Sequence, residues 1–126
     1  MTDQLHQSEI MFPKFYQRLM AENLAKYDVL AEMEPWYFVE QHKCFFAHTL
    51  WPNVCNEKLF VFARRQDNDD LAAFLVDATN KAEQVYILHG WTNEGFCIMK
   101  KLPDIWSWMH MVIDDMQEWV ELNEYL

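Results

Sequence analysis

Residues 58–100 contain four short apolar runs that are separated by short polar stretches. The runs cover 58–63, 71–78, 84–91 and 96–100, and the stretches between them are rich in Asp, Asn, Thr and Gly. Short apolar runs bounded by such turn residues are typical of strands, and sequential strands with short connections usually pair with each other. The sequence therefore predicts an antiparallel meander whose last turn lies in the stretch GWTNEG.

Helices are predicted on both sides of this meander in the sequence. Between residues 8 and 27, apolar side chains recur every three or four positions, with Ser8 as a candidate cap and Pro13 in the first turn. The apolar residues of this stretch are Phe12, Phe15, Tyr16, Leu19, Met20 and Tyr27. Two prolines interrupt the next segment, for which we expect a short helix near 29–33 and then extended or irregular chain.

The most regular helical pattern begins after Pro103 and runs for about five turns. Its apolar stripe consists of Leu102, Ile105, Met109, Val112, Ile113, Met116, Trp119 and Val120. At about 100° per residue, Asp114, Glu118 and Glu121 fall on the opposite face of this helix, with Asp115 to one side.

The carboxylates of the terminal helix have no basic partner within it, because no Lys or Arg follows Asp104. Neighbouring carboxylates repel by roughly 0.2–0.5 kcal/mol per pair, so the isolated fold gains nothing from this face. Trp108 and Met111 lie on the flank of the apolar stripe. They are either partly exposed anchors for a partner or are covered by the N-terminal helix or a neighbouring subunit.

The formal net charge of −10 lies mainly in the second half of the chain. Residues 1–65 contain eight acidic and seven basic residues, a net of −1, whereas residues 66–126 contain twelve and three, a net of −9. This excess argues against nucleic acid or an anionic membrane as a partner and favours a basic protein. Solubility alone is the alternative explanation.

The sequence contains no recognisable catalytic or cofactor-binding motif, so we expect no enzymatic activity. The histidines and cysteines lack close ligand pairs, although His42 and His48 could converge with Cys44 or Cys55 on zinc. We expect no cofactor and no metal site, and we expect reduced, mostly buried cysteines. His89 is more typical of a structural histidine than of a base.

The charged stretch 62–74, FARRQDNDDLAAF, has three interpretations: a metal loop, a contact patch or the tip of a hairpin. A calcium loop needs acids at alternating positions, a central glycine and a glutamate at its twelfth position, and this stretch has no glycine. Asn and Asp suit turn positions, and the two arginines can pair with the aspartates that follow. The hairpin tip is the favoured interpretation, with partner contact as the alternative.

The length predicts one domain that spans residues 1–126. No stretch approaches the ~20 continuous apolar residues that cross a bilayer, and the first residues show neither a basic nor an apolar leader segment. We therefore expect a cytoplasmic protein of the α+β class. In it, a mainly antiparallel meander packs against an N-terminal helix and a long C-terminal helix.

The run FARRQDNDDLAAF, followed by VYILHGW, the glycine of EGF and the terminal IWSWMHMVIDDMQEW, resembles the SUKH superfamily of bacterial immunity proteins. The resemblance covers about residues 58–120 and is a pattern of strands with a few polar residues. It implies an α+β fold with a curved, mainly antiparallel sheet and helices packed on it. It also implies a non-enzymatic protein that binds and inhibits a toxin, often a nuclease, encoded beside it.

These observations lead to the hypothesis of an immunity protein that occludes a basic toxin of a contact-dependent or polymorphic toxin system. The predicted toxin-binding residues are Asp114, Asp115, Glu118, Glu121, Trp108, Met111, Glu94, Asp69 and Asp70. One alternative is a non-enzymatic regulatory or scaffold module with a cellular protein partner. Another is a ligand binder or enzyme that uses the surface around Trp91 and His89. A homodimer is compatible with all three.

Overall fold

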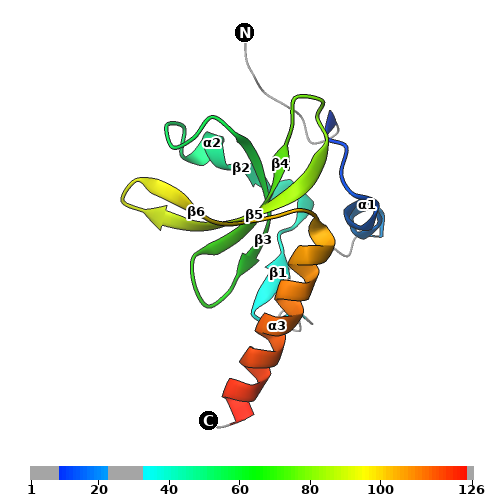
Figure 1. Ribbon diagram of the computed structural model, residues 1–126, viewed down its shortest axis with the longest axis vertical. Helices are drawn as coiled ribbons and strands as arrows, with labels where there is room; N and C mark the ends of the chain where they lie inside the picture. The colour runs from blue at the N-terminus through cyan, green and yellow to red at the C-terminus, as the bar shows by residue number, and fades with distance from the viewer. Residues whose placement is uncertain (1–8, 23–32, 125–126) are drawn as a thin grey trace.

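The computed structural model describes residues 9–22 and 33–124, which form an open six-stranded antiparallel sheet with an N-terminal and a C-terminal helix (Figure 1). The helices are α1 (Lys14–Ala21), the short α2 (Ala47–Leu50) and the long α3 (Ile105–Glu124), with a 3-10 turn, η2, at Gln41–Lys43. The strands are β1 (Trp36–Phe38), β2 (Phe45–Phe46), β3 (Lys58–Arg65), β4 (Asp70–Val76), β5 (Ala82–Thr92) and β6 (Gly95–Leu102). The predicted α+β class is confirmed.

Strands β3 to β6 form the predicted meander, and β1 and β2 both pair with β3. The strand order is β1-β3-β4-β5-β6, and every pair is antiparallel. The register places Phe60 opposite Phe74 and Ala73 opposite Tyr86. The predicted turn before the last strand is confirmed, and Gly95 begins β6 with a φ of 115°, a conformation that favours glycine.

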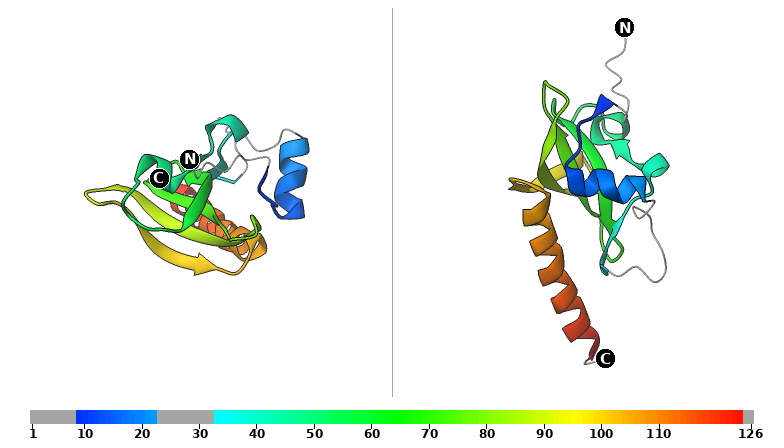
Figure 2. Two further views of the ribbon diagram at one scale, coloured as in Figure 1. Left: turned by 90° about the horizontal axis from the view of Figure 1, so that it is seen from above. Right: turned by 90° about the vertical axis from the view of Figure 1, so that its right-hand side faces the viewer.

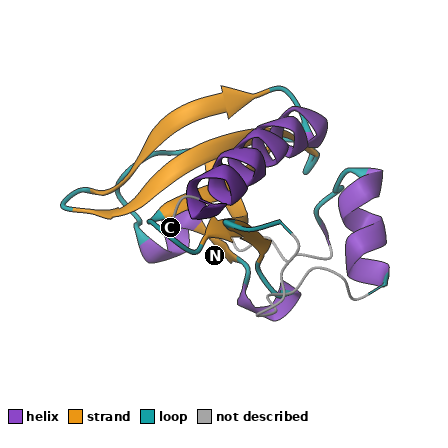
Figure 3. Cartoon of the chain, turned by 90° about the horizontal axis from the view of Figure 1, so that it is seen from below, coloured by secondary structure: helices purple, strands orange, loops and turns teal. Residues whose placement is uncertain are grey.

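One face of the sheet carries a core rich in aromatic rings. This aromatic face consists of Phe60, Phe62, Phe74, Val85 and Ile87. Helices α1 and α3 cover it with Tyr16 and Trp108, both fully buried, and Figure 3 shows α3 lying over one side of the sheet. Phe62 stacks on Phe74 with ring centroids 4.1 Å apart, and Trp108 meets Phe62 at 5.1 Å. Such stacked and edge-to-face ring pairs are favourable geometries for aromatic packing in a core.

The second face of the sheet is covered by a much shorter part of the chain. This second face consists of Leu59, Val61, Leu71, Ala73, Tyr86 and Leu88. Its cover is the segment 45–57, in which Ala47 is buried whereas Trp51 and Val54 are only half-buried. Trp51 lies directly on the sheet, because a side chain at Gly95 would come within 3.0 Å of its ring.

Helix α1 begins at Lys14, later than the start predicted near Ser8, which lies outside the described residues together with Tyr27. The reason is Pro13, which has no N–H to donate and forces the residue before it out of helical geometry. The preceding chain pairs instead with the sheet, where the Met11 N–H donates to the Asn80 carbonyl at 2.8 Å.

Between α1 and β3 the structure describes residues 33–57, in which short elements alternate with irregular chain, and the helix α2 among them was not predicted. Residues 29–32 of the expected short helix lie outside the described part of the chain, and Met33 lies in a turn. The short strands β1 and β2 supply the extended chain that was expected after it.

Candidate protein-binding surface

The predicted terminal helix is confirmed as α3, but it is turned about its axis relative to the prediction. Its buried side is formed by Ile105, Trp108 and Val112, each at most 1% exposed. Ile113 and Val120, which were predicted in the buried stripe, are 54% and 55% exposed. The difference corresponds to a rotation of roughly half the 100° step between residues.

The prediction that Trp108 is a partly exposed anchor is wrong, because this side chain is completely buried. Its ring packs against Trp36 and Phe38 of β1 and against Phe62 of β3, so the cover comes from the sheet. Met111 is half-buried and packs against the same core. A partner could therefore touch only part of Met111 and none of Trp108.

Four large apolar side chains of α3, including Leu122, are exposed, although the Trp106 ring also packs against the Phe15 ring of α1, with centroids 5.0 Å apart. Trp106, Ile113 and Val120 are 57%, 54% and 55% exposed, and we call them the apolar row. They follow each other at seven-residue intervals, which places them on one side of a helix within about 40°. The last turns of α3 extend beyond the sheet, so the end of this row lies on a projecting part of the molecule (Figure 2).

A second row of exposed side chains on α3 is acidic. Asp114, Glu118 and Glu121 are all exposed, and we call them the acidic row. It lies about 100° around the helix from the apolar row, with Gln117 between them; the Gln117 amide donates to Glu121 at 3.0 Å. No Lys or Arg occurs in α3, so repulsion between these carboxylates is not compensated within the helix.

Asp115 belongs to the fold rather than to this exposed surface. Its carboxylate accepts a hydrogen bond from Trp36 Nε1 at 2.8 Å and lies 3.5 Å from Arg65 Nη1. Its side chain is 20% exposed. The expectation that the carboxylates of α3 lack internal partners is therefore wrong for Asp115, which ties α3 to β1 and to the β3–β4 hairpin.

The hairpin tip has the structural role that its sequence predicts. Arg65 donates two hydrogen bonds to Asp67, at 2.8 and 2.9 Å, and these bonds raise the pKa of Arg65 and lower that of Asp67. Asn68 Oδ1 accepts the Asp70 N–H at 2.8 Å, as in an Asx turn. Arg65 and Asp67 thus neutralise each other at the tip, whereas the predicted pairing of Arg64 with an aspartate is not observed among the described residues.

The remaining predicted residues are not gathered around α3. Asp69 is exposed at the hairpin tip, and Asp70 is half-buried with its carboxylate 3.0 Å from His89 Nδ1. This contact supports the structural interpretation of His89. Glu94 is exposed in the β5–β6 turn, which points away from α3 in Figure 1. Of the predicted residues, only Asp114, Glu118 and Glu121 form one continuous exposed group.

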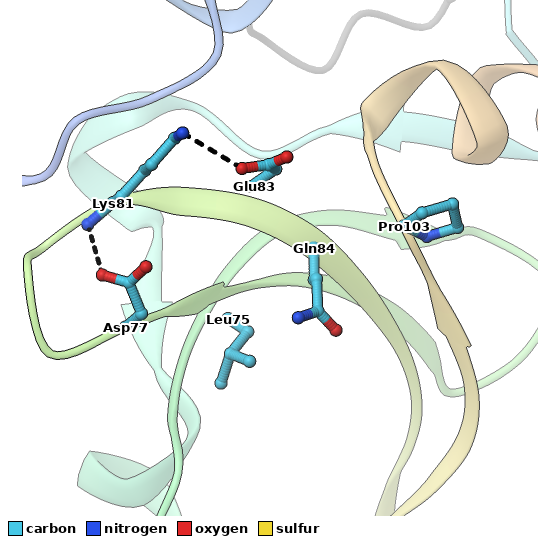
Figure 4. A pocket seen from close by; sticks show the side chains of 6 residues that line it. All are labelled: Leu75, Asp77, Lys81, Glu83, Gln84 and Pro103. Carbon is cyan, nitrogen blue, oxygen red and sulfur yellow. Dashed lines mark hydrogen bonds and ion pairs between the residues drawn. The ribbon is translucent and has the colours of Figure 1, made fainter.

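A shallow groove of about 370 Å³ lies beside the β4–β5 turn (Figure 4). Its charged groups already have partners, since Lys81 Nζ lies 3.2 Å from Glu83 and Asp77 accepts the Lys81 N–H at 3.0 Å. The Thr79 hydroxyl also donates to Asp77, which lowers the pKa of this carboxyl. The charged groups of the groove are therefore engaged within the turn and its neighbouring strand.

The cysteines differ from the expectation that most of them are buried. Cys44 is buried and near the hydroxyl of Tyr16, at 3.6 Å, and burial raises the pKa of its thiol to about 11. Cys55 is half-buried and Cys97 is exposed. Among residues 9–22 and 33–124, no group of three His, Cys, Asp or Glu side chains could hold a metal ion.

Comparison of the chain with protein-family models, with curated proteins and with solved structures finds no match. The resemblance to the SUKH superfamily therefore stays a prediction. In the described part of the chain, no helix is both long enough and apolar enough to cross a membrane.

Proposed function

We propose that this protein is a bacterial immunity protein that binds a basic toxin, in particular a nuclease domain, and covers its active site or substrate surface. The observation that carries the proposal is the parallel course of the apolar row and the acidic row along α3. A partner with apolar anchors beside basic side chains would match both rows at once. The proposal includes a cytoplasmic location, where an imported nuclease would reach its substrate.

The charge of α3 favours a basic partner over a second copy of the chain. Two α3 helices packed along their apolar rows would bring their acidic rows close together, and like charges in an interface oppose association. A nuclease domain is basic because its substrate is a polyanion, so its surface offers the opposite charge. A stable complex of this kind buries on the order of 1,600 Å².

The role in immunity is tested by coexpression with the product of the adjacent gene. We expect the protein to relieve the toxicity of that product and to purify with it as a stoichiometric complex. If toxicity persists and no complex forms, the immunity role is rejected. A complex with a non-toxic cellular protein would instead favour a regulatory or scaffold module.

The position of the interface is tested by reversing the acidic row with the triple substitution Asp114→Lys, Glu118→Lys and Glu121→Lys. Association with the toxin should slow by about tenfold or more at low salt and should depend less on salt. The matched control is a triple substitution to Lys at the exposed glutamates Glu9, Glu22 and Glu83, which changes the net charge equally.

The apolar row is tested separately by Trp106→Ala, which should mainly accelerate dissociation. Stopped-flow and surface-based kinetics at several salt concentrations measure both effects. Equal slowing by the two triple substitutions would show that only net charge matters and would reject α3 as the interface.

A further inference from the structure

A cavity of about 250 Å³ lies at the β1 edge of the sheet, away from both rows of α3. The described residues that line it are Tyr37, Val39, Glu40, Lys43, Phe45 and Arg64. Its walls thus combine two aromatic rings, two cations and one carboxylate. At about 30 Å³ per water molecule, the space corresponds to roughly eight waters, which suits a small organic molecule.

The charge that faces this cavity is positive, although the whole chain is strongly acidic. Among the described residues, neither Arg64 nor Lys43 has a carboxylate within ion-pairing distance, whereas the neighbouring Arg65 has two. Glu40 is the one acidic residue of the lining, and its carboxylate lies 3.6 Å from His42. An anion entering the cavity would therefore meet two cations without an ion-pair partner.

One nitrogen of the Arg64 guanidinium is withdrawn from water without a hydrogen-bond partner among the described residues. This buried atom is Nε, so only the outer amino groups can bind a ligand. The charge of Arg64 has no counter-ion among the described residues, and an anion at its outer amino groups would supply one. The fold keeps this arginine in place at a cavity that it does not fill.

The position of Arg64 is fixed by aromatic packing. Its guanidinium carbon lies 4.7 Å from the centre of the Trp91 ring, and Trp91 in turn meets Trp51 at 5.3 Å. Trp91 has a φ of 54°, a left-handed conformation that is strained for a bulky residue. Strain of this kind is typical of positions that hold a functional group in place. The stacked ring restricts the guanidinium before any ligand arrives, which lowers the entropy lost on binding.

We propose that this cavity binds a small organic anion, whose carboxylate or phosphate pairs with Arg64 and Lys43 while its flat apolar part lies between Tyr37 and Phe45. The site is separate from α3. The proposal of an anion site therefore does not depend on whether the protein neutralises a toxin. All candidate ligands share an anionic group attached to a small planar apolar ring. Carboxylate and phosphate are the two sources of that negative group, and the experiment distinguishes them.

The test uses three aromatic probes of similar size, benzoate, phenyl phosphate and the neutral benzyl alcohol, together with inorganic phosphate, all at low ionic strength. Titration is followed by ¹H–¹⁵N correlation spectra of the full chain. We expect saturable shifts at the amides of Tyr37, Phe45 and Arg64 and at the indole N–H of Trp91, with a Kd of about 1 mM or below for an aromatic anion. Whichever of benzoate and phenyl phosphate binds with the lower Kd identifies the preferred anionic group.

Substitutions then separate the site from general charge attraction. Lys43→Gln, at an exposed position that cannot disturb the core, should weaken binding about threefold. Arg64→Gln should weaken it about tenfold or more. The control is Lys100→Gln, an equal change of charge at an exposed position on β6, the opposite edge of the sheet, which should leave the Kd unchanged.

Three results would overturn the proposal: no saturable shift with either aromatic anion, equal binding of benzyl alcohol, or equal weakening by Lys43→Gln and Lys100→Gln. Binding of inorganic phosphate with an affinity equal to that of phenyl phosphate would reject the aromatic part of the proposal and leave a simple anion site.

Discussion

The two faces of the sheet differ in how they are covered. The adjacent residues Arg64 and Arg65, which point to opposite faces, differ accordingly in their partners. On the aromatic face, α3 supplies the carboxylate of Asp115 to Arg65 and buries Trp108 beneath it. On the second face, the short segment 45–57 supplies no carboxylate to Arg64, which stacks on Trp91 and lines a cavity together with Phe45. Arg65 is thus part of the structural contacts on one face, whereas Arg64 on the other face can still bind an anion.

This comparison indicates where each part of the molecule can tolerate change. On the face covered by two helices, Arg65 has two carboxylate partners and Trp108 is fully buried, although Trp108 Nε1 has no hydrogen-bond partner among the described residues. Changes on this face should therefore mainly alter stability. A face closed by a single segment retains an unpaired cation, so changes there alter binding at a smaller cost in stability. The substitutions below test this division.

The largest expected effect is on the core of the aromatic face. Trp108→Ala should lower the free energy of unfolding by about 3–5 kcal/mol, because it leaves a large cavity among fixed rings. Trp51→Ala, on the second face, should cost about 2 kcal/mol, since this side chain is only half-buried. Urea unfolding followed by circular dichroism measures both values. Equal losses would contradict the proposed difference between the faces.

A smaller effect is expected at the contact between α3 and the hairpin. Asp115→Ala should cost about 2 kcal/mol, because it removes the hydrogen bond from Trp36 and the ion pair with Arg65. The neighbouring Asp114→Ala, at an exposed position, should change stability by less than about 0.5 kcal/mol. If the two substitutions have the same effect, Asp115 does not tie the helix to the sheet.

The smallest expected effect on stability comes from three carboxylates in the connections between strands and before α3. Hydrogen bonds from Arg65, Thr79 and the Ser107 N–H lower the pKa of Asp67, Asp77 and Asp104, respectively, below the ordinary value of 3.8. A carboxyl group whose pKa is lowered in the folded state stabilises the fold at pH values above its ordinary pKa. This contribution is lost as the pH falls through the lowered pKa.

Thermal unfolding should therefore shift to lower temperature as the pH falls below about 4. The variant Asp77→Asn should show a shallower decline than the wild type. The variant Asp114→Asn, which removes an exposed carboxylate outside these turns, should follow the wild-type curve. Parallel curves for the wild type and Asp77→Asn would contradict the assignment.

The sheet could be predicted from the sequence because its signals are local. Each strand between residues 58 and 102 is bounded by turn residues, so neighbouring strands pair without information from distant parts of the chain. The rotation of α3 could not be predicted in the same way. Its buried side is decided by Trp36 in β1, a strand of three residues within a segment that has no clear period.

The candidate sites were predicted only in part, for physical reasons that differ. The seven-residue spacing of Trp106, Ile113 and Val120 was present in the sequence and could have indicated a second apolar side of α3. The position of Arg64 depends on an irregularity in the pairing of β3 between Val61 and Ala63. Without that shift, strict alternation would send Arg64 to the aromatic face with Phe60 and Phe62, and no local residue pattern indicates it.

The contact between Trp51 and Gly95 has an evolutionary consequence. A methyl group at Gly95 would lie 2.8 Å from Val54 and 3.0 Å from the Trp51 ring, and the positive φ adds a second penalty. Divergent sequences that keep this fold should therefore lose the glycine only together with changes at both Val54 and Trp51. Position 95 is expected to covary with positions 51 and 54, although these lie 44 and 41 residues away in the chain.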